Sequence, residues 1–212
     1  MTKELIQAAQ AEIRAGRPAF LVSIASATGS APRAAGAMML VGKGGLIGGT
    51  IGGGLLEHRC MEEAQAALSR SVRPAGGASG VSMSGFLRSF ILDNRTAGGL
   101  GMICGGNTEV LFTPLLTASE ETLKRASELL EQGEPCALML PLDGSPFLSL
   151  REGRPFTDSL RKPQIGSENG RPFLSVPLAS VNRVFLFGGG HVAAELAVLL
   201  KQLDFPFLTA DD

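Results

Sequence analysis

The stretch Phe187-Gly188-Gly189-Gly190-His191-Val192-Ala193 decides the fold class of the C-terminal part of the chain. An apolar run precedes it over residues 183–187, and an apolar helical pattern follows it. A second apolar run over residues 205–210 then leads to Asp211. This order of strand, glycine turn, helix, strand and acid is typical of the opening βαβ unit of a Rossmann-like domain. We therefore expect residues 179–212 to begin such a domain.

The residues of this turn have separate roles in dinucleotide binding. Gly188 permits the tight turn, and Gly190 lets the backbone approach a pyrophosphate at the helix N-terminus, where His191 also lies. Asp211 follows at about the 20-residue distance from which an acid bonds a ribose hydroxyl. The pattern predicts NAD(P) or another nucleotide, or a Rossmann-like fold used only for packing. Since a doubly wound sheet needs several βα units, we expect a truncated domain within a fragment of a longer protein.

Residues 1–178 show the pattern of a mixed α/β domain. Apolar runs such as 19–25 indicate strands, and helical patterns lie between them. The polar stretch 152–172, which contains Pro and Gly, is expected to be an irregular connection. The sequence therefore predicts an α/β fold in which this N-terminal domain precedes the start of a Rossmann-like domain.

The composition excludes several function classes. The 212 residues carry a net charge of -1, which argues against a nucleic-acid-binding protein. No apolar run approaches the roughly 18 residues that span a bilayer. Because the N-terminus also lacks a signal-peptide core, we expect a cytoplasmic protein with no membrane partner. The three cysteines are too few and too scattered for a disulfide framework or a CxxC metal site.

A second glycine cluster, Gly49-Thr50-Ile51-Gly52-Gly53-Gly54, directly precedes a helical pattern. The bare backbone N–H groups of Gly52, Gly53 and Gly54 and the dipole of the helix could together hold a phosphate. Glu57 lies in the first turn of this helix. It either belongs to that site or simply places a negative charge near the positive end of the helix dipole.

A third glycine cluster is Met102-Ile103-Cys104-Gly105-Gly106. A cysteine beside two glycines is more accessible than one on a helix face, so Cys104 could bind a soft metal centre or carry sulfur. A buried small residue would fit the pattern equally well. Cys60 and Cys136 lie in apolar patterns, and we expect both in the core.

Three segments in this order resemble the XdhC/CoxI family: Gly29-Ser30-Ala31-Pro32-Arg33-x-x-Gly36, Gly49-Thr50-Ile51-Gly52-Gly53-Gly54-x-x-Glu57, and Met102-x-Cys104-Gly105-Gly106. The C-terminal glycine turn is similar to the Rossmann-type domain of that family. Its members are accessory factors of molybdenum hydroxylases such as xanthine dehydrogenase.

The resemblance implies a chaperone that binds molybdenum cofactor (molybdopterin) and assists its sulfuration and insertion into a hydroxylase client. It also implies a cysteine desulfurase as sulfur source, a homodimer, and an accessory role more than that of a turnover enzyme. The implied cofactor site consists of Ser30, Arg33, Gly52, Gly53, Gly54, Glu57, Cys104 and Gly105. Within it, Cys104 is the candidate neighbour of the molybdenum, because a thiol suits a soft metal centre.

One position departs from the family pattern. Leu55 stands directly after the three glycines, where many family members have Cys, so the sulfur-handling step is either absent here or left to Cys104. An alternative function is an NAD(P)-dependent oxidoreductase built on residues 179–212. The sequence offers no matched acid–base pair near that unit.

Overall fold

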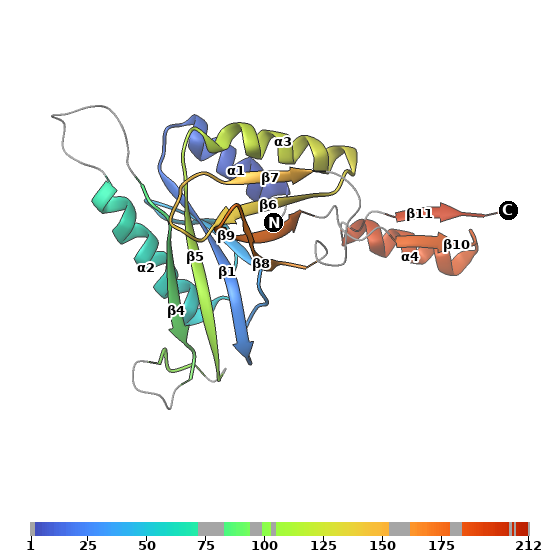
Figure 1. Cartoon of the computed structure of the whole chain (residues 1–212). Helices are drawn as coiled ribbons and strands as arrows, with labels where there is room; N and C mark the ends of the chain where they lie inside the picture. Colours follow the sequence, from blue (N-terminus) through green and yellow to red (C-terminus); the bar gives the residue numbers. More distant parts are fainter. Residues whose placement is uncertain are drawn as a thin grey trace. The chain divides into compact units, whose positions relative to one another are not determined.

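The computed structural model describes residues 3–71, 83–93, 99–102, 105–152, 162–178, 184–203, 205 and 207–211. The chain divides into two compact units, Met1–Leu178 and Ala179–Asp212. Each unit contains both helices and strands (Figure 1), so the expected α/β class is confirmed.

The first unit is organised around a five-stranded antiparallel sheet with the order β3-β2-β1-β5-β4. Its strands are β1 (Ala19–Gly29), β2 (Met38–Gly42), β3 (Gly45–Gly49), β4 (Phe86–Ile91) and β5 (Gly106–Leu115). The two longest, β1 and β5, pair along their whole length at the centre, with one bulge between Ile24 and Ser26. This central pair sets the positions of the other strands.

Helices cover both faces of the five-stranded sheet. The helix α2 (Gly54–Ser71) packs Leu56 and Cys60 against Phe20 and Phe112 on one face. On the other face lie α1 (Lys3–Arg14) and α3 (Ser119–Gln132). Burial on both faces explains why the first seven residues of β1 form an almost continuous apolar run instead of an alternating one.

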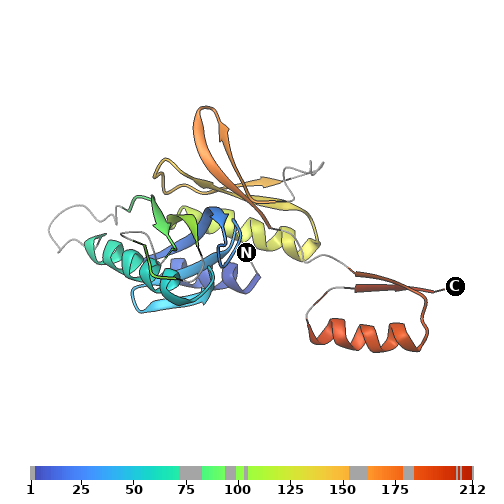
Figure 2. The same ribbon diagram turned by 90° about the horizontal axis from the view of Figure 1, so that it is seen from below.

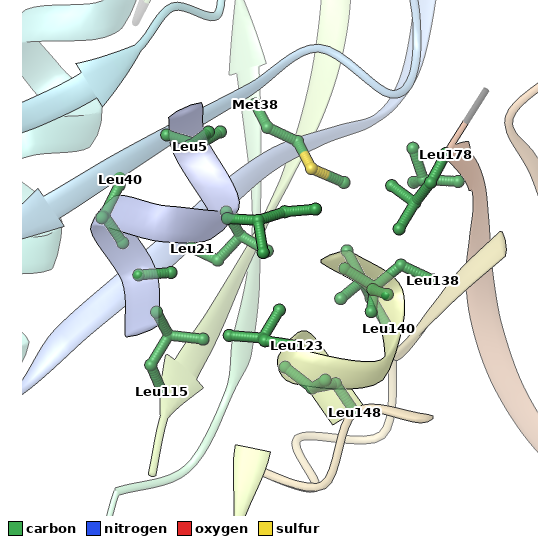
Figure 3. Close-up of a cluster of buried hydrophobic side chains, with 14 of the residues drawn as sticks. Leu5, Leu21, Met38, Leu40, Leu115, Leu123, Leu138, Leu140, Leu148 and Leu178 are labelled. Carbon is green, nitrogen blue, oxygen red and sulfur yellow. The ribbon is translucent and has the colours of Figure 1, made fainter. Parts of the chain in front are cut away.

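A second, four-stranded sheet lies across α3, as Figure 2 shows. Its order is β7-β6-β9-β8, with strands β6 (Cys136–Pro141), β7 (Ser149–Glu152), β8 (Gln164–Glu168) and β9 (Arg171–Leu178). One face of this sheet joins the helices in a shared core, in which Leu138 and Leu140 gather with Leu123 and Leu21 (Figure 3). The two sheets are therefore held together by one apolar cluster around α1 and α3.

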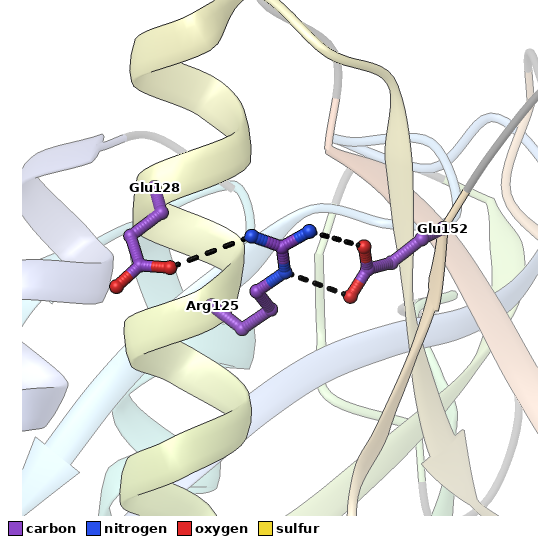
Figure 4. Close-up of polar contacts among 3 residues, drawn as sticks. All are labelled: Arg125, Glu128 and Glu152. Carbon is purple, nitrogen blue, oxygen red and sulfur yellow. Dashed lines mark hydrogen bonds and ion pairs between the residues drawn. The ribbon is translucent and has the colours of Figure 1, made fainter.

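An ion-pair network also links α3 to β7 (Figure 4). The guanidinium of Arg125 donates from Nε and Nη2 to the two carboxylate oxygens of Glu152, at 2.9 and 2.7 Å, and its Nη1 lies 3.5 Å from Glu128. These bonds, with Glu152 first, raise the pKa of Arg125 above its ordinary value. Because all three side chains are solvent-accessible, the network contributes little to the stability of the fold.

The expectation of an irregular connection over residues 152–172 is wrong in its C-terminal half. Strand β8 lies there and pairs with β9 through a two-residue turn at Asn169 and Gly170, both of which have positive φ. Such a turn is type I′, for which Asn-Gly is a preferred sequence. The sequence of β8 has little apolar alternation and therefore did not predict a strand. Residues 153–161 lie outside the described residues.

The second unit has the expected βαβ order. It consists of β10 (Val184–Phe187), α4 (His191–Gln202) and β11 (Phe207–Ala210), and the two strands pair in parallel. None of the described helices in either unit combines the length and the apolar character that crossing a bilayer requires.

Shortening a buried leucine tests the core assignment. We expect Leu21→Ala to lower the free energy of unfolding by about 2–5 kcal/mol, because Leu21 is 0% exposed and its loss leaves a cavity. The matched change Leu46→Ala, at a side chain that is 45% exposed, should cost about 0.5 kcal/mol or less. Urea denaturation followed by circular dichroism measures both values, and equal losses would contradict this core.

Candidate functional site

The turn that follows β1 contacts the glycine loop that precedes α2. At Gly52, φ is 128°, and a Cβ placed there would lie 2.6 Å from Pro32 Cβ and 3.4 Å from Arg33 Cγ. Only glycine therefore allows this approach. The contact brings two of the predicted site segments, the Ser30–Arg33 turn and the Gly52–Gly54 loop, into one place.

The third segment contacts the same turn. Gly106 begins β5 opposite Gly29, the last residue of β1. A Cβ on Gly106 would collide with the carbonyl oxygen of Thr28, and the N–H of Ser30 donates to the carbonyl oxygen of Gly105 at 3.4 Å. The described parts of all three segments therefore meet at one end of the five-stranded sheet. Cys104 itself lies outside the described residues.

Glu57 organises the glycine loop from the first turn of α2. Its Oε2 accepts a hydrogen bond from Thr50 Oγ1 at 2.6 Å and from the N–H groups of Ile51 and Gly53, each at 3.1 Å. The N–H of Gly52 donates to Thr50 Oγ1, also at 3.1 Å. In this structure two of the three N–H groups expected to hold a phosphate, those of Gly52 and Gly53, are thus bonded within the loop, together with that of Ile51.

These bonds determine the charge state of Glu57. Burial alone would raise its pKa, but the hydrogen bonds from Thr50, Ile51 and Gly53 outweigh burial and hold the pKa below its ordinary value of 4.5. The carboxylate is therefore charged at neutral pH. Sequence reasoning assigned Glu57 to a ligand site or to the helix dipole and did not identify Thr50 as its partner, although both lie in the same motif.

Exposed groups surround this loop. Ser30, Arg33, Gly54 and Leu55 are all exposed, and Arg33 forms no ion pair with any described residue. Leu55, at 43% exposure, lies at the start of α2 where the resemblance places a cysteine in many relatives. Arg33 therefore presents a cation beside the loop.

The other two cysteines are buried thiols. Burial first, and neighbouring carboxylates second, raise the pKa of Cys60 to about 12 and that of Cys136 to about 11. Neither is a thiolate at neutral pH, and both belong to the apolar core as expected. Within the described ranges no three or more His, Cys, Asp or Glu side chains gather as a metal site.

The second unit brings its predicted residues together at one glycine turn. The N–H of Gly188 donates to the carbonyl oxygen of Ala210 at 2.7 Å, and a Cβ on Gly189 would collide with the carboxylate of Asp211. Gly190 is the N-cap residue of α4 and has no side chain to cap the helix. His191 is exposed in the first turn of this helix. Asp211 thus lies beside the turn, as the dinucleotide pattern predicts.

Comparisons with known proteins agree with part of this interpretation. Residues 12–74 match the model of the XdhC and CoxI family, which confirms the expected resemblance over the stretch that holds Arg33 and Glu57. A comparison with curated protein sequences gives no match.

One solved structure has a similar fold. A xanthine dehydrogenase from Bacillus halodurans superposes with a TM-score of 0.63 and 20% sequence identity, over 99% of this chain and 62% of that one. This chain thus spans less than two thirds of the length of that protein, and the likeness concerns the fold alone.

Removing the Glu57 carboxylate tests its role in the loop. We expect Glu57→Gln to lower the free energy of unfolding by about 1–3 kcal/mol at pH 7, because three donors lose a charged acceptor. Since the pKa of Glu57 is lowered in the fold, this contribution is present above about pH 4.5 and is lost as the pH falls through the folded pKa.

Urea titrations at a series of pH values measure this difference. Glu62→Gln, on the exposed side of the same helix, is the matched control and should change stability little at any pH. A difference between wild type and Glu57→Gln that persists unchanged at pH 3 would contradict the charged role.

Proposed function

From the match of residues 12–74 to the XdhC and CoxI family, we propose that this protein binds molybdenum cofactor and assists its sulfuration and its insertion into a molybdenum hydroxylase. A cysteine desulfurase is its proposed sulfur source, and a homodimer its proposed assembly. The cofactor is cargo that passes to a client, so the protein is an accessory factor rather than a turnover enzyme.

The observation that carries this proposal is the meeting of three separate segments at one end of the sheet. The Ser30–Arg33 turn packs on Gly52, and Ser30 bonds to Gly105. A cofactor with a phosphate and a soft metal centre needs a cation and a sulfur-compatible neighbour in one place. Arg33 is the exposed cation, and Cys104 immediately precedes Gly105 in the sequence.

The hydrogen bonds of the loop refine the assignment of roles. Because the N–H groups of Gly52 and Gly53 bond to Thr50 and Glu57, the phosphate is assigned to Arg33 and Ser30 and not to those two glycines. The glycine loop then acts as the surface against which the Ser30–Arg33 turn is held. Cys104 is assigned to the molybdenum or its sulfur.

Cofactor retention tests this assignment. The protein is purified from cells that make molybdenum cofactor, and bound molybdenum and pterin are measured by mass spectrometry and by fluorescence after oxidation. We expect Arg33→Ala to weaken retention at least about tenfold, since a charge-assisted bond to phosphate is lost. Cys104→Ala should reduce bound molybdenum as well.

Two matched controls accompany these variants. Arg59→Ala removes an exposed arginine of α2 and should leave retention unchanged. Gly52→Ala should weaken retention more than Gly53→Ala, because both have positive φ but only the Cβ at position 52 meets Pro32. Equal retention by wild type, Arg33→Ala and Cys104→Ala would remove the site assignment.

A second candidate function, an NAD(P)-dependent oxidoreductase, draws on the contact between Gly189 and Asp211 in the second unit. An acid at this place bonds the ribose hydroxyls of NAD and repels the additional phosphate of NADP. On this hypothesis the whole chain binds NADH more tightly than NADPH, and Asp211→Asn narrows that preference. Calorimetric titration with both cofactors measures the ratio, and no binding of either would exclude this function.

A further inference from the structure

Gly36, the last glycine of the first motif, is not among the residues of the candidate site. It follows Arg33 by three residues and leads into β2. The N–H of Ala37 donates to the carbonyl oxygen of Ala34 at 3.3 Å, and Gly36, the third residue of this turn, has a φ of 86°. A positive φ at the third position is typical of a type II turn and favours glycine. The chain therefore reverses its direction directly after Arg33.

Gly36 also contacts the four-stranded sheet. A Cβ placed on Gly36 would collide with Cγ of Pro163, and it would lie 2.9 Å from Cβ of the same proline and 3.5 Å from Cγ1 of Val176. Pro163 directly precedes β8, and Val176 is buried in β9. Gly170, by contrast, has a φ of 76° but would have nothing within 4 Å of a Cβ. Position 36 therefore requires glycine for two separate reasons, the turn and the close approach of the sheet.

Both sheets of the first unit hold Gly36. The N–H of Gly36 donates to the carbonyl oxygen of Ile24 in β1 at 2.8 Å. On the other side, Pro163 is followed by Gln164, which pairs with Ser175 of β9, and β9 in turn pairs with β6. The ring of a proline also fixes its own φ. Gly36 thus lies between a strand of the central sheet and a rigid residue at the start of β8.

We propose that Pro163 is a positioning residue for Arg33. Through Gly36, Pro163 supports the end of the turn that follows Arg33, while Gly52 contacts Pro32 on the preceding side. Arg33 is exposed and forms no ion pair with any described residue, so its position depends on the backbone. A backbone that is already ordered loses less conformational entropy when the side chain binds an anion. The role in binding rests on the proposed function, whereas the support of the turn does not.

This contact is not needed to join the two sheets. The apolar cluster around α1 and α3 already joins them. Gly36 and Pro163 are both only partly buried, so their contact covers little apolar area. Its effect is therefore expected on the position of the turn more than on the stability of the fold.

Hydrogen exchange followed by mass spectrometry tests the support of the turn without any ligand. We expect Gly36→Ala to speed the exchange of the amides over residues 30–37 at least about tenfold, because the new Cβ collides with Pro163. Gly170→Ala is the matched control, since it introduces the same kind of backbone strain at the other end of β8. It should leave the exchange over residues 30–37 unchanged.

A second variant separates the contact from the strain of the turn. In Gly36→Ala/Pro163→Gly the colliding atoms of the proline are gone, so exchange over residues 30–37 should be slower than in Gly36→Ala alone. Retention of molybdenum cofactor should follow the same order, lowest in Gly36→Ala, partly restored in the double variant and unchanged in Gly170→Ala. Pro163→Gly alone adds no atom and should speed the exchange less than Gly36→Ala does.

The outcomes distinguish this proposal from the proposed function. Equal exchange over residues 30–37 in Gly36→Ala and Gly170→Ala would overturn the positioning role, as would a double variant that exchanges as fast as Gly36→Ala. If Gly36→Ala does not fold, Pro163→Gly decides, and unchanged exchange in that variant overturns the role. Full cofactor retention by Gly36→Ala despite faster exchange would overturn the link to binding. The expected exchange together with no retention even in wild type supports the contact and contradicts the proposed function.

Discussion

The antiparallel pairing of β1 with β5 is the constraint on which the rest of the first unit depends. It extends from Ala19 opposite Leu115 to Gly29 opposite Gly106. At the first end both faces are covered by helices, so the pair is fixed by apolar burial. At the other end the same register brings the chain after Gly29 beside the chain before Gly106. The geometry of the candidate site therefore depends on the packing of a core that lies several residues away along the two strands.

Polar bonding takes over where this apolar core ends. Beyond the bulge after Ile24, Ser26 donates to Glu109 across the two strands at 2.7 Å. Bulges increase the local twist of a strand pair and commonly lie near functional sites. In the neighbouring loop the carboxylate of Glu57, and not a paired strand, accepts three hydrogen bonds. The Gly49–Gly54 loop is thus ordered by the side chains of Thr50 and Glu57.

The sequence alone was sufficient to predict the elements that have a strong apolar pattern. The buried run at the start of β1 and the strand–turn–helix order around Gly190 follow directly from periodicity. Strand β8 did not, because Gln164, Ser167 and Glu168 interrupt any alternation and its place depends on pairing with β9. The Asn169–Gly170 pair was the local signal for that hairpin.

The candidate site was predictable in its parts and not in its arrangement. Glycine clusters mark places where backbone approaches closely, but no spacing reveals that Gly52 contacts Pro32 or that Gly106 pairs with Gly29. Those contacts depend on a strand register set by long-range packing. The same limit applies to Glu57, which accepts a hydrogen bond from the N–H of Gly53, one of the groups that the sequence suggested for a phosphate.

The internal bonding of the glycine loop bears on what an accessory factor requires. A cradle of free N–H groups, such as that of a P-loop, holds a phosphate from several sides and favours retention. Here Ile51, Gly52 and Gly53 donate within the loop, and the side chains to which the phosphate is assigned, Ser30 and Arg33, are exposed. Water competes for an exposed guanidinium, so a contact with it breaks and re-forms more readily than a contact inside an enclosed cradle. On the proposed function, such a site suits a cofactor that must leave for a client, because a few exposed contacts can be exchanged one at a time.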